Sequence, residues 1–193
     1  MIARACAAAV ALLAVLAPRA RADQVFLREA EAPRVVFGEG VTAEQKVLEL
    51  SGTELANLSR LLGRRVEISR YPYLEVSSEP GSPGAPRQLL GWVFPLDVIG
   101  QSLPITFAVG VEVDGVLKDI QVMVYREPHG DEIRERRFRA QFSGKTLQQP
   151  LIVGKDIDAI TGATISSYSA AYAARKGLAL ADVLRRRVRA SMP

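Results

Sequence analysis

The N-terminal third of the chain combines leucines at near-helical spacing with short alternating stretches. Leucines recur from 41 to 63 in a pattern that predicts helix, interrupted at Ser51-Gly52-Thr53, where a second helix can be capped. Before this segment, Val35-Val36-Phe37 predicts a short extended piece. After it, apolar residues alternate with charged ones from Arg64 to Tyr71 and predict a strand.

The middle of the chain has the pattern of an antiparallel sheet. Strands are predicted at Leu90–Val98, Pro104–Val113 and Val116–Tyr125. Asp114-Gly115, between the last two, is typical of a hairpin with a type I′ turn, whose two central residues need positive φ. The segment Glu79–Pro86 contains three prolines and two glycines, so we expect an exposed loop inside the domain.

The C-terminal segment Ser166–Arg189 has the clearest helical pattern. Mostly small residues recur at spacings of three and four and predict a helix that packs closely on a sheet. This stripe consists of Ala170, Ala173, Ala174, Gly177, Ala181, Leu184 and Val188. A basic segment around Phe138 and Phe142 is also predicted to be helical. The expected fold class is α+β, with an antiparallel sheet, a long C-terminal helix and a helical N-terminal portion.

The first 22 residues have the layout of a secretory signal peptide. Arg4 precedes an apolar run from Ala5 to Ala17, and Ala20-Arg21-Ala22 is typical of a cleavage site. The run is shorter than the ~20 residues that span a bilayer, so we expect export to the periplasm and no transmembrane helix after cleavage. The expected organisation is a signal peptide at 1–22, an N-terminal helical and strand portion at 23–87, and a second domain at 88–193.

Charge and cysteine content exclude several classes of function. The formal charge of +4 falls to about +1 when Arg4, Arg19 and Arg21 leave with the signal, so the mature surface is not expected to bind nucleic acid. The only cysteine, Cys6, leaves as well, which excludes disulfides and cysteine-based metal or haem sites. With His129 as the only histidine, no metal site and no serine hydrolase triad are expected.

The candidate chemistry lies just before the last helix, in the segment from Asp158 to Ser167. Four hydroxyls occur within it, on Thr161, Thr164, Ser166 and Ser167. Gly162 lets the backbone turn and Ala163 keeps the space small. Because a helix N-terminus presents unpaired N–H groups and partial positive charge, these residues predict a phosphate-ester site near Thr164. An ordinary helix N-cap explains the same hydroxyls.

The sequence Asp158-Ala-Ile-Thr-Gly-Ala-Thr164-Ile-Ser-Ser resembles the flavinylation motif of the FMN-binding domain family. That family includes the periplasmic flavin subunits of the Rnf and Na⁺-pumping quinone reductase complexes. Its pattern is Asp, two variable residues, Ser or Thr, Gly, Ala, and a final Ser or Thr that carries FMN through a phosphoester. The resemblance implies that Thr164 is the attachment residue. It also implies that a flavin transferase recognises Asp158, Thr161, Gly162 and Ala163.

Upstream residues extend the resemblance to roughly Leu90–Leu184, so the second domain is expected to be the FMN-binding domain. Gly115, Tyr125-Arg126-Glu127, Gly130 and Phe142-Ser-Gly-Lys145 occur in the same order as in that family. One departure is the cleavable signal, which replaces the N-terminal membrane anchor of the large-complex subunits. Direct membership in a pump is therefore not expected.

Several other residues are candidates around a flavin. Glu127 is expected either to contact the flavin or to orient its loop, and Lys145 either to reach the phosphate or ring or to be a plain surface lysine. His129 is expected either to contact the flavin or to be a solvated turn residue. Trp92 and Phe94 are expected in the core rather than as a stacking platform.

The resemblance implies a periplasmic flavoprotein with covalent FMN, acting as an electron carrier or redox subunit rather than a stand-alone enzyme. Its expected partners are a flavin transferase and a membrane reductase, a cytochrome or a quinone-linked system. The alternative is an exported, non-redox binding module that holds a phosphate ester or peptide at the start of the last helix.

Overall fold

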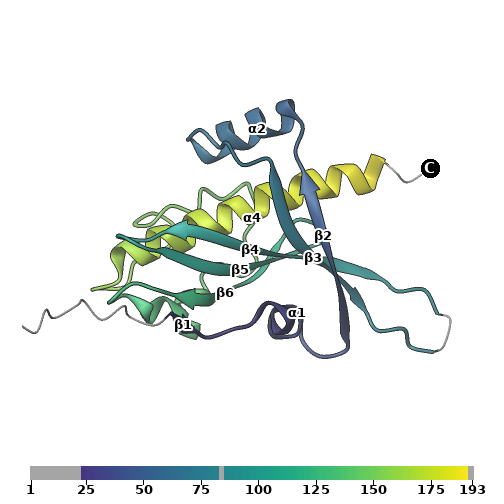
Figure 1. Cartoon of the computed structure of the whole chain (residues 1–193), viewed down its shortest axis with the longest axis horizontal. Coiled ribbons are helices and arrows are strands. Elements are labelled where there is room, and N and C mark those ends of the chain that lie inside the picture. The colour runs from purple at the N-terminus through teal and green to yellow at the C-terminus, as the bar shows by residue number, and fades with distance from the viewer. Residues whose placement is uncertain (1–22, 83–84, 191–193) are drawn as a thin grey trace, which may run out of the picture.

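A six-stranded antiparallel sheet organises the computed structural model, which describes residues 23–82 and 85–190 (Figure 1). The strands are β1 (Gln24–Val25), β2 (Val41–Glu49), β3 (Arg70–Ser78), β4 (Leu89–Ile99), β5 (Pro104–Glu112) and β6 (Leu117–Tyr125). Their order across the sheet is β1-β6-β5-β4-β3-β2, so β3 and β4 pair across the expected boundary at residue 87. The predicted signal peptide lies outside the described residues.

Helices cover both faces of this sheet. They are η1 (Glu29–Glu31, 3-10), α1 (Ala32–Phe37), α2 (Gly52–Leu62), η2 (Asp131–Arg134, 3-10), α3 (Arg136–Arg139) and α4 (Thr164–Ala190). The long helix α4 crosses β4, β5 and β6 on one face, and α2 packs against α4 (Figure 1). The short helix α1 lies on the opposite face, over a smaller core that includes Val36, Val93 and Met123. None of the helices in the described ranges is long and apolar enough to cross a membrane.

The predicted α+β class is confirmed, and so are most of the elements from α2 onward. The three central strands and α4 lie within a few residues of their predicted bounds. Ser51 caps α2, because its hydroxyl accepts the N–H of Glu54 and the Glu54 carboxylate accepts the N–H of Ser51 in return. Trp92 and Phe94 are fully buried, which confirms their predicted place in the core.

Three predictions for the N-terminal portion were wrong. Residues 41–49 form strand β2 rather than helix, since they pair in register with β3, where Leu48 lies opposite Tyr71 and is buried in the main core. Residues 35–37 belong to helix α1, which buries Ala32, Pro33 and Val36 against the sheet. The strand predicted from Arg64 to Tyr71 begins only at Arg70.

The β5–β6 hairpin is present, but its turn is not the predicted type I′. Gly115 has φ of +91°, whereas Leu151 is the only non-glycine with positive φ among the described residues, so Asp114 does not have it. The N–H of Gly115 donates to the carbonyl of Glu112, and the N–H of Glu112 donates to the carbonyl of Val116. A turn centred on Val113 and Asp114 followed by a glycine at positive φ is the three-residue hairpin connection with a bulge.

The stripe of small residues on α4 sets how closely this helix approaches β5. A Cβ placed on Gly177 would lie 2.4 Å from Cγ1 of Val109. The backbone of α4 therefore rests almost directly on the sheet. This contact fixes the position of the helix whose first residue is Thr164.

Candidate functional site

The start of α4 presents several polar groups without protein partners. Thr164 is the first helical residue and is exposed, and its hydroxyl makes no hydrogen bond within the described part of the chain. Along α4, the first backbone N–H with an acceptor is that of Ser167, which donates to the carbonyl of Ala163 at 2.9 Å. Within residues 23–82 and 85–190, the N–H groups of Thr164, Ile165 and Ser166 have no acceptor.

The two serines that follow turn inward and hold this helix end in place. The hydroxyl of Ser167 donates to the carbonyl of Ala163 and accepts the N–H of Ile160 at 3.3 Å, which fastens the preceding loop to the helix. The hydroxyl of Ser166 lies 2.9 Å from that of Tyr125. Tyr125 itself donates to the carbonyl of His129, so Ser166 supplies the proton of the other hydrogen bond.

Residues 160–163, the loop before α4, contain both exposed and buried members of the Asp158–Ser167 motif. The N–H of Ala163 donates to the carbonyl of Ile160, and Gly162 in this turn has φ of +87°, which favours glycine. The Ala163 side chain is buried, whereas Thr161 is exposed. Since Ala163 directly precedes the helix and carries no hydroxyl, the structure offers no ordinary side-chain N-cap at this end.

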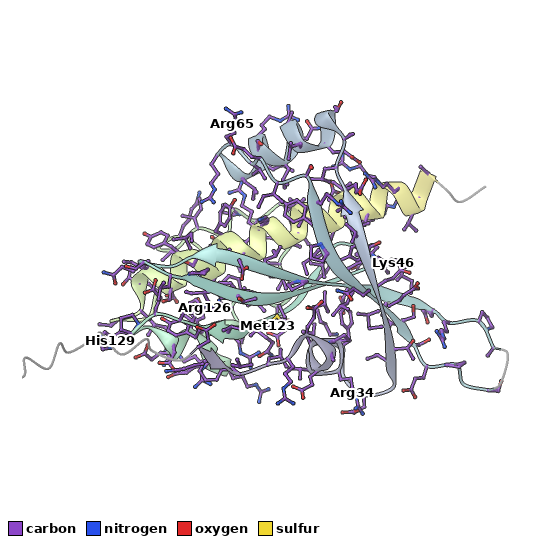
Figure 2. All side chains as sticks on the ribbon, in the orientation of Figure 1. Arg34, Lys46, Arg65, Met123, Arg126 and His129 are labelled. Carbon is purple, nitrogen blue, oxygen red and sulfur yellow. The ribbon has the colours of Figure 1, made fainter. Side chains whose placement is uncertain are left out.

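A shallow pocket of about 220 Å³ lies beside Thr164. Three segments enclose it: the β4–β5 loop, the turn after β6 and the start of α4. Its lining residues are Gln101, Glu127, His129, Gly162, Ala163, Thr164, Ile165 and Ser166. Figure 2 labels His129 at this end of the sheet, far from Lys46 on β2.

Glu127 orients one wall of the pocket. Its side chain is buried, and one carboxylate oxygen accepts the N–H groups of Ser102 and Leu103 at 2.5 and 2.8 Å. A Cβ on Gly100 would lie 2.7 Å from the same oxygen, so the β4–β5 loop fits closely around it. Of the two predicted roles for Glu127, these contacts support loop orientation, and direct contact with a flavin stays a prediction.

Lys145, a predicted site residue, is not among the residues that line the Thr164 pocket. The Lys145 ammonium is 3.4 Å from the Asp156 carboxylate. Burial alone would raise the pKa of Asp156, but the N–H groups of Ile152 and Leu151, together with Lys145, lower it. The reach of Lys145 to a phosphate or ring stays a prediction.

Asp158 occupies a neighbouring hollow. Its N–H donates to the Gln141 side-chain oxygen at 2.7 Å, and its own side chain is exposed. With Arg137, Phe138, Ile160 and others it lines a separate hollow of about 350 Å³. The carboxylate is therefore accessible from solution, as a residue recognised by another protein needs to be.

Sequence reasoning did not single out three contributors to the site. Gln101 and Ile165 line the pocket, and Tyr125 fixes Ser166. Gln101 lies in a loop with no periodic pattern, so nothing in the sequence pointed to it. Tyr125 was part of the matched family segment, yet its hydroxyl contact depends on the fold. No cluster of His, Cys, Asp and Glu that could hold a metal occurs within the described ranges.

Comparison with known proteins finds one domain model and a solved structure that are similar to this chain. Residues 100–179, from the β4–β5 loop to the middle of α4, match the FMN-binding domain. The crystal structure of NqrC from Shewanella oneidensis is similar in fold, with a TM-score of 0.52 and 17% sequence identity. The similarity covers 82% of this chain and 88% of that one. No curated protein sequence matches the chain.

Proposed function

We propose, from the match of residues 100–179 to the FMN-binding domain, that this protein is an exported flavoprotein that transfers electrons through FMN attached to Thr164. The attachment is a phosphoester to the Thr164 hydroxyl. One observation carries this choice of residue: the exposed Thr164 hydroxyl has no partner in the described structure and is the first side chain of a helix with three free N–H groups.

The helix end fits a phosphate. A phosphodiester keeps one negative charge, which the free N–H groups of Thr164, Ile165 and Ser166 and the helix dipole stabilise. Glu127 also lines this pocket, and one of its carboxylate oxygens accepts the N–H groups of Ser102 and Leu103. The remaining pocket is open and small, so a covalent tether supplies the effective concentration that the pocket alone does not.

Attachment requires an activated flavin donor and an enzyme that acts on this chain. With a flavin dinucleotide as donor, the Thr164 oxygen bonds to the FMN phosphorus, the pyrophosphate P–O bond breaks, and a nucleoside monophosphate leaves. The hydroxyl proton passes to a base of the transferase. Asp158, Thr161 and Gly162 are exposed on the approach to Thr164, where such a transferase would contact them.

Once attached, the flavin exchanges one or two electrons with a partner. This chain holds the site in place. The Tyr125–Ser166 hydrogen bond fixes one wall beside Thr164, and the hydrogen bonds from Ser102 and Leu103 to Glu127, here called the Glu127 clamp, fix another. Partners of the proposed carrier are a membrane reductase, a cytochrome or a quinone-linked system, in keeping with the fold shared with NqrC. Export to the periplasm rests on residues 1–22, whose sequence is typical of a signal peptide.

Mass spectrometry after co-production with an active flavin transferase tests the attachment. We expect one added FMN on the wild type and on Thr164→Ser, and none on Thr164→Ala. Thr53→Ala is the matched control, because Thr53 is also an exposed threonine in the first turn of a helix. Voltammetry of the modified protein should then show reversible reduction.

Two outcomes would contradict the covalent proposal. One is an unmodified wild type beside a second substrate that the same transferase does modify. The other is a Thr164→Ala variant that still gains FMN. A phosphate ester that binds wild type reversibly, and is lost on dialysis, would instead support the non-redox binding module.

A further inference from the structure

The outer edge of β2 is long, regular and unpaired in the described structure. β2 is the last strand of the sheet and runs for nine residues, whereas the other edge strand, β1, has two. Its pairing with β3 is continuous from Val41 to Glu49, without a bulge. A long edge strand with neither proline nor bulge is a template for another strand.

Backbone hydrogen bonds define which groups of β2 face outward. The N–H of Leu50 donates to Ser69, and the N–H of Glu79 donates to Gly40, at the two ends of the β2–β3 ladder. Because such bonds alternate along an antiparallel pair, the even-numbered residues of β2 bond to β3. The odd-numbered residues therefore direct their N–H and C=O groups to the open edge: Val41, Ala43, Gln45, Val47 and Glu49.

The charges of this strand are incompletely matched within one copy. Glu44 lies directly opposite Glu75 of β3, a like-charge pair that is unfavourable by itself. The Lys46 ammonium lies 2.5 Å from Glu75 and 3.4 Å from Glu44, so a single cation serves two carboxylates. The Glu44 side chain is 74% exposed and has room for a second cation.

We propose that two copies of this chain associate through β2, antiparallel and centred on Gln45, to form one continuous twelve-stranded sheet. In this register Glu44 of each copy lies opposite Lys46 of the other. Ala43 lies opposite Val47, and the outward N–H and C=O groups of both strands meet.

Alternative registers are less favourable. Centring the pair on residue 44 or 46 places Glu opposite Glu or Lys opposite Lys. Centring it on residue 43 or 47 leaves little more than half of the strand paired. The charge pattern of β2 thus selects the register centred on Gln45.

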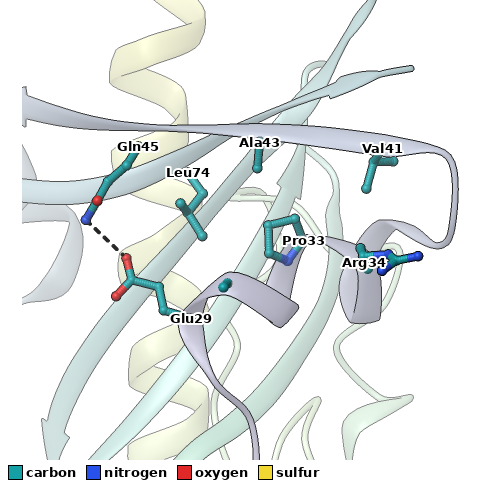
Figure 3. Close-up of a pocket in the computed structure, with 8 residues that line it drawn as sticks. Glu29, Pro33, Arg34, Val41, Ala43, Gln45 and Leu74 are labelled. Carbon is teal, nitrogen blue, oxygen red and sulfur yellow. Dashed lines mark hydrogen bonds between the residues drawn. The ribbon is translucent and has the colours of Figure 1, made fainter. Parts of the chain in front are cut away.

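The side chains around the edge leave space for the second strand. Lysine on an edge strand often prevents pairing, but the Lys46 ammonium turns along its own sheet toward Glu75. On the other face, Val41, Ala43 and Gln45 point from β2 over a cavity of about 480 Å³ beside η1 and α1 (Figure 3). Val47, half exposed in the single copy, would be covered by Ala43 of the second copy.

The expected dimer is reversible and leaves both flavin sites free. A single pair of strands makes a small interface, and interfaces below about 1,200 Å² belong to the weak class. The start of α4 lies at the end of the sheet away from β2 (Figure 1). Association is therefore independent of flavin attachment and can be tested without it.

Sedimentation over a range of protein concentrations tests the proposal. We expect a monomer–dimer equilibrium for the wild type, weakened at least about tenfold by Glu44→Lys, which places Lys opposite Lys twice. Lys46→Glu should have the same effect, since it places Glu opposite Glu. Glu132→Lys is the charge-matched control, because Glu132 is exposed in η2, outside the β2 edge.

Mixing the two single variants gives the decisive measurement. Glu44→Lys and Lys46→Glu should each remain monomeric, yet the equimolar mixture should form a heterodimer with opposite charges paired. Circular dichroism of each variant checks that it is folded. If Lys46→Glu does not fold, the sedimentation of Glu44→Lys alone tests the proposal. A wild type that stays monomeric throughout, or a dimer indifferent to Glu44→Lys, overturns the proposal.

Discussion

The Tyr125 hydroxyl at the end of β6 lies 2.9 Å from the Ser166 hydroxyl in the first turn of α4. Both side chains are buried, and Tyr125 also donates to the carbonyl of His129 in the turn that lines the pocket. This pair connects the sheet, the turn and the helix that carries Thr164. The position of the proposed attachment residue is thereby fixed by contacts among residues far apart in the chain.

Tyr125→Phe should destabilise the protein by about 1–2 kcal/mol, because it leaves the buried Ser166 hydroxyl and the His129 carbonyl without their partner. Urea unfolding at neutral pH measures the change. Tyr168→Phe is the control, since Tyr168 is exposed on the same helix. Equal stability of the two variants would show that the buried hydroxyl pair contributes nothing.

Glu127→Ala should speed amide hydrogen exchange at Ser102 and Leu103 by roughly tenfold or more, because both N–H groups lose their acceptor. Glu127→Gln keeps a side-chain oxygen at this position and should retain more of the protection. Glu132→Ala, at an exposed glutamate, should leave these two amides unchanged. Unaltered exchange of the Ser102 and Leu103 amides in Glu127→Ala would contradict these hydrogen bonds to Glu127.

Arg187→Met should reduce stability at neutral pH, because it removes the ion pair between Arg187 and Glu54. The loss should not exceed about 1 kcal/mol, since this pair is partly exposed and is screened by solvent. Hydrogen bonds from Arg187 lower the pKa of Glu54 to about 2, from its ordinary 4.5. A lowered folded-state pKa stabilises the fold above the ordinary value, and this stabilisation is lost as the pH falls from about 5 toward 2.

Unfolding by urea at several pH values between 7 and 2 checks this prediction. The Arg187→Met variant should lose part of the acid dependence in that window, and NMR titration should show the pKa of Glu54 rising. Arg189→Met removes a nearby exposed arginine and should change neither. An unchanged Glu54 titration in Arg187→Met would refute the assignment.

Gly177→Ala should destabilise the protein by about 1–3 kcal/mol, since the new methyl would lie 2.4 Å from Val109. That clash outweighs the gain of about 1 kcal/mol in helix propensity. Gly52→Ala in α2, with no atom within 4 Å of the new Cβ, is the control and should be neutral or mildly stabilising. Thermal unfolding compares the two, and a neutral Gly177→Ala would mean that α4 can shift away from β5.

Local patterns predicted the central strands, α2 and α4 well, because each pattern involves residues close in the chain. The hairpin between β5 and β6 and the Ser51 cap are of this kind. The strand β2 was mistaken for helix, since its leucine spacing is ambiguous and its alternation is set by pairing with β3, beyond α2 in the sequence. The clamp on Ser102 and Leu103 by Glu127 likewise joins a patternless loop to a distant carboxylate.

By itself, the sequence determined that a group of hydroxyls lies at the start of a long helix with a narrow stripe of small residues, and the motif that contains these hydroxyls indicated Thr164. Only the tertiary structure decided which hydroxyls face solvent. Ala163, Ser166, Ser167 and Ala170 lie three and four residues apart and are buried, while Thr164 is left outside. The physical reason is the rotation of α4 about its axis, which its close contact with β5 at Gly177 fixes and no local pattern encodes.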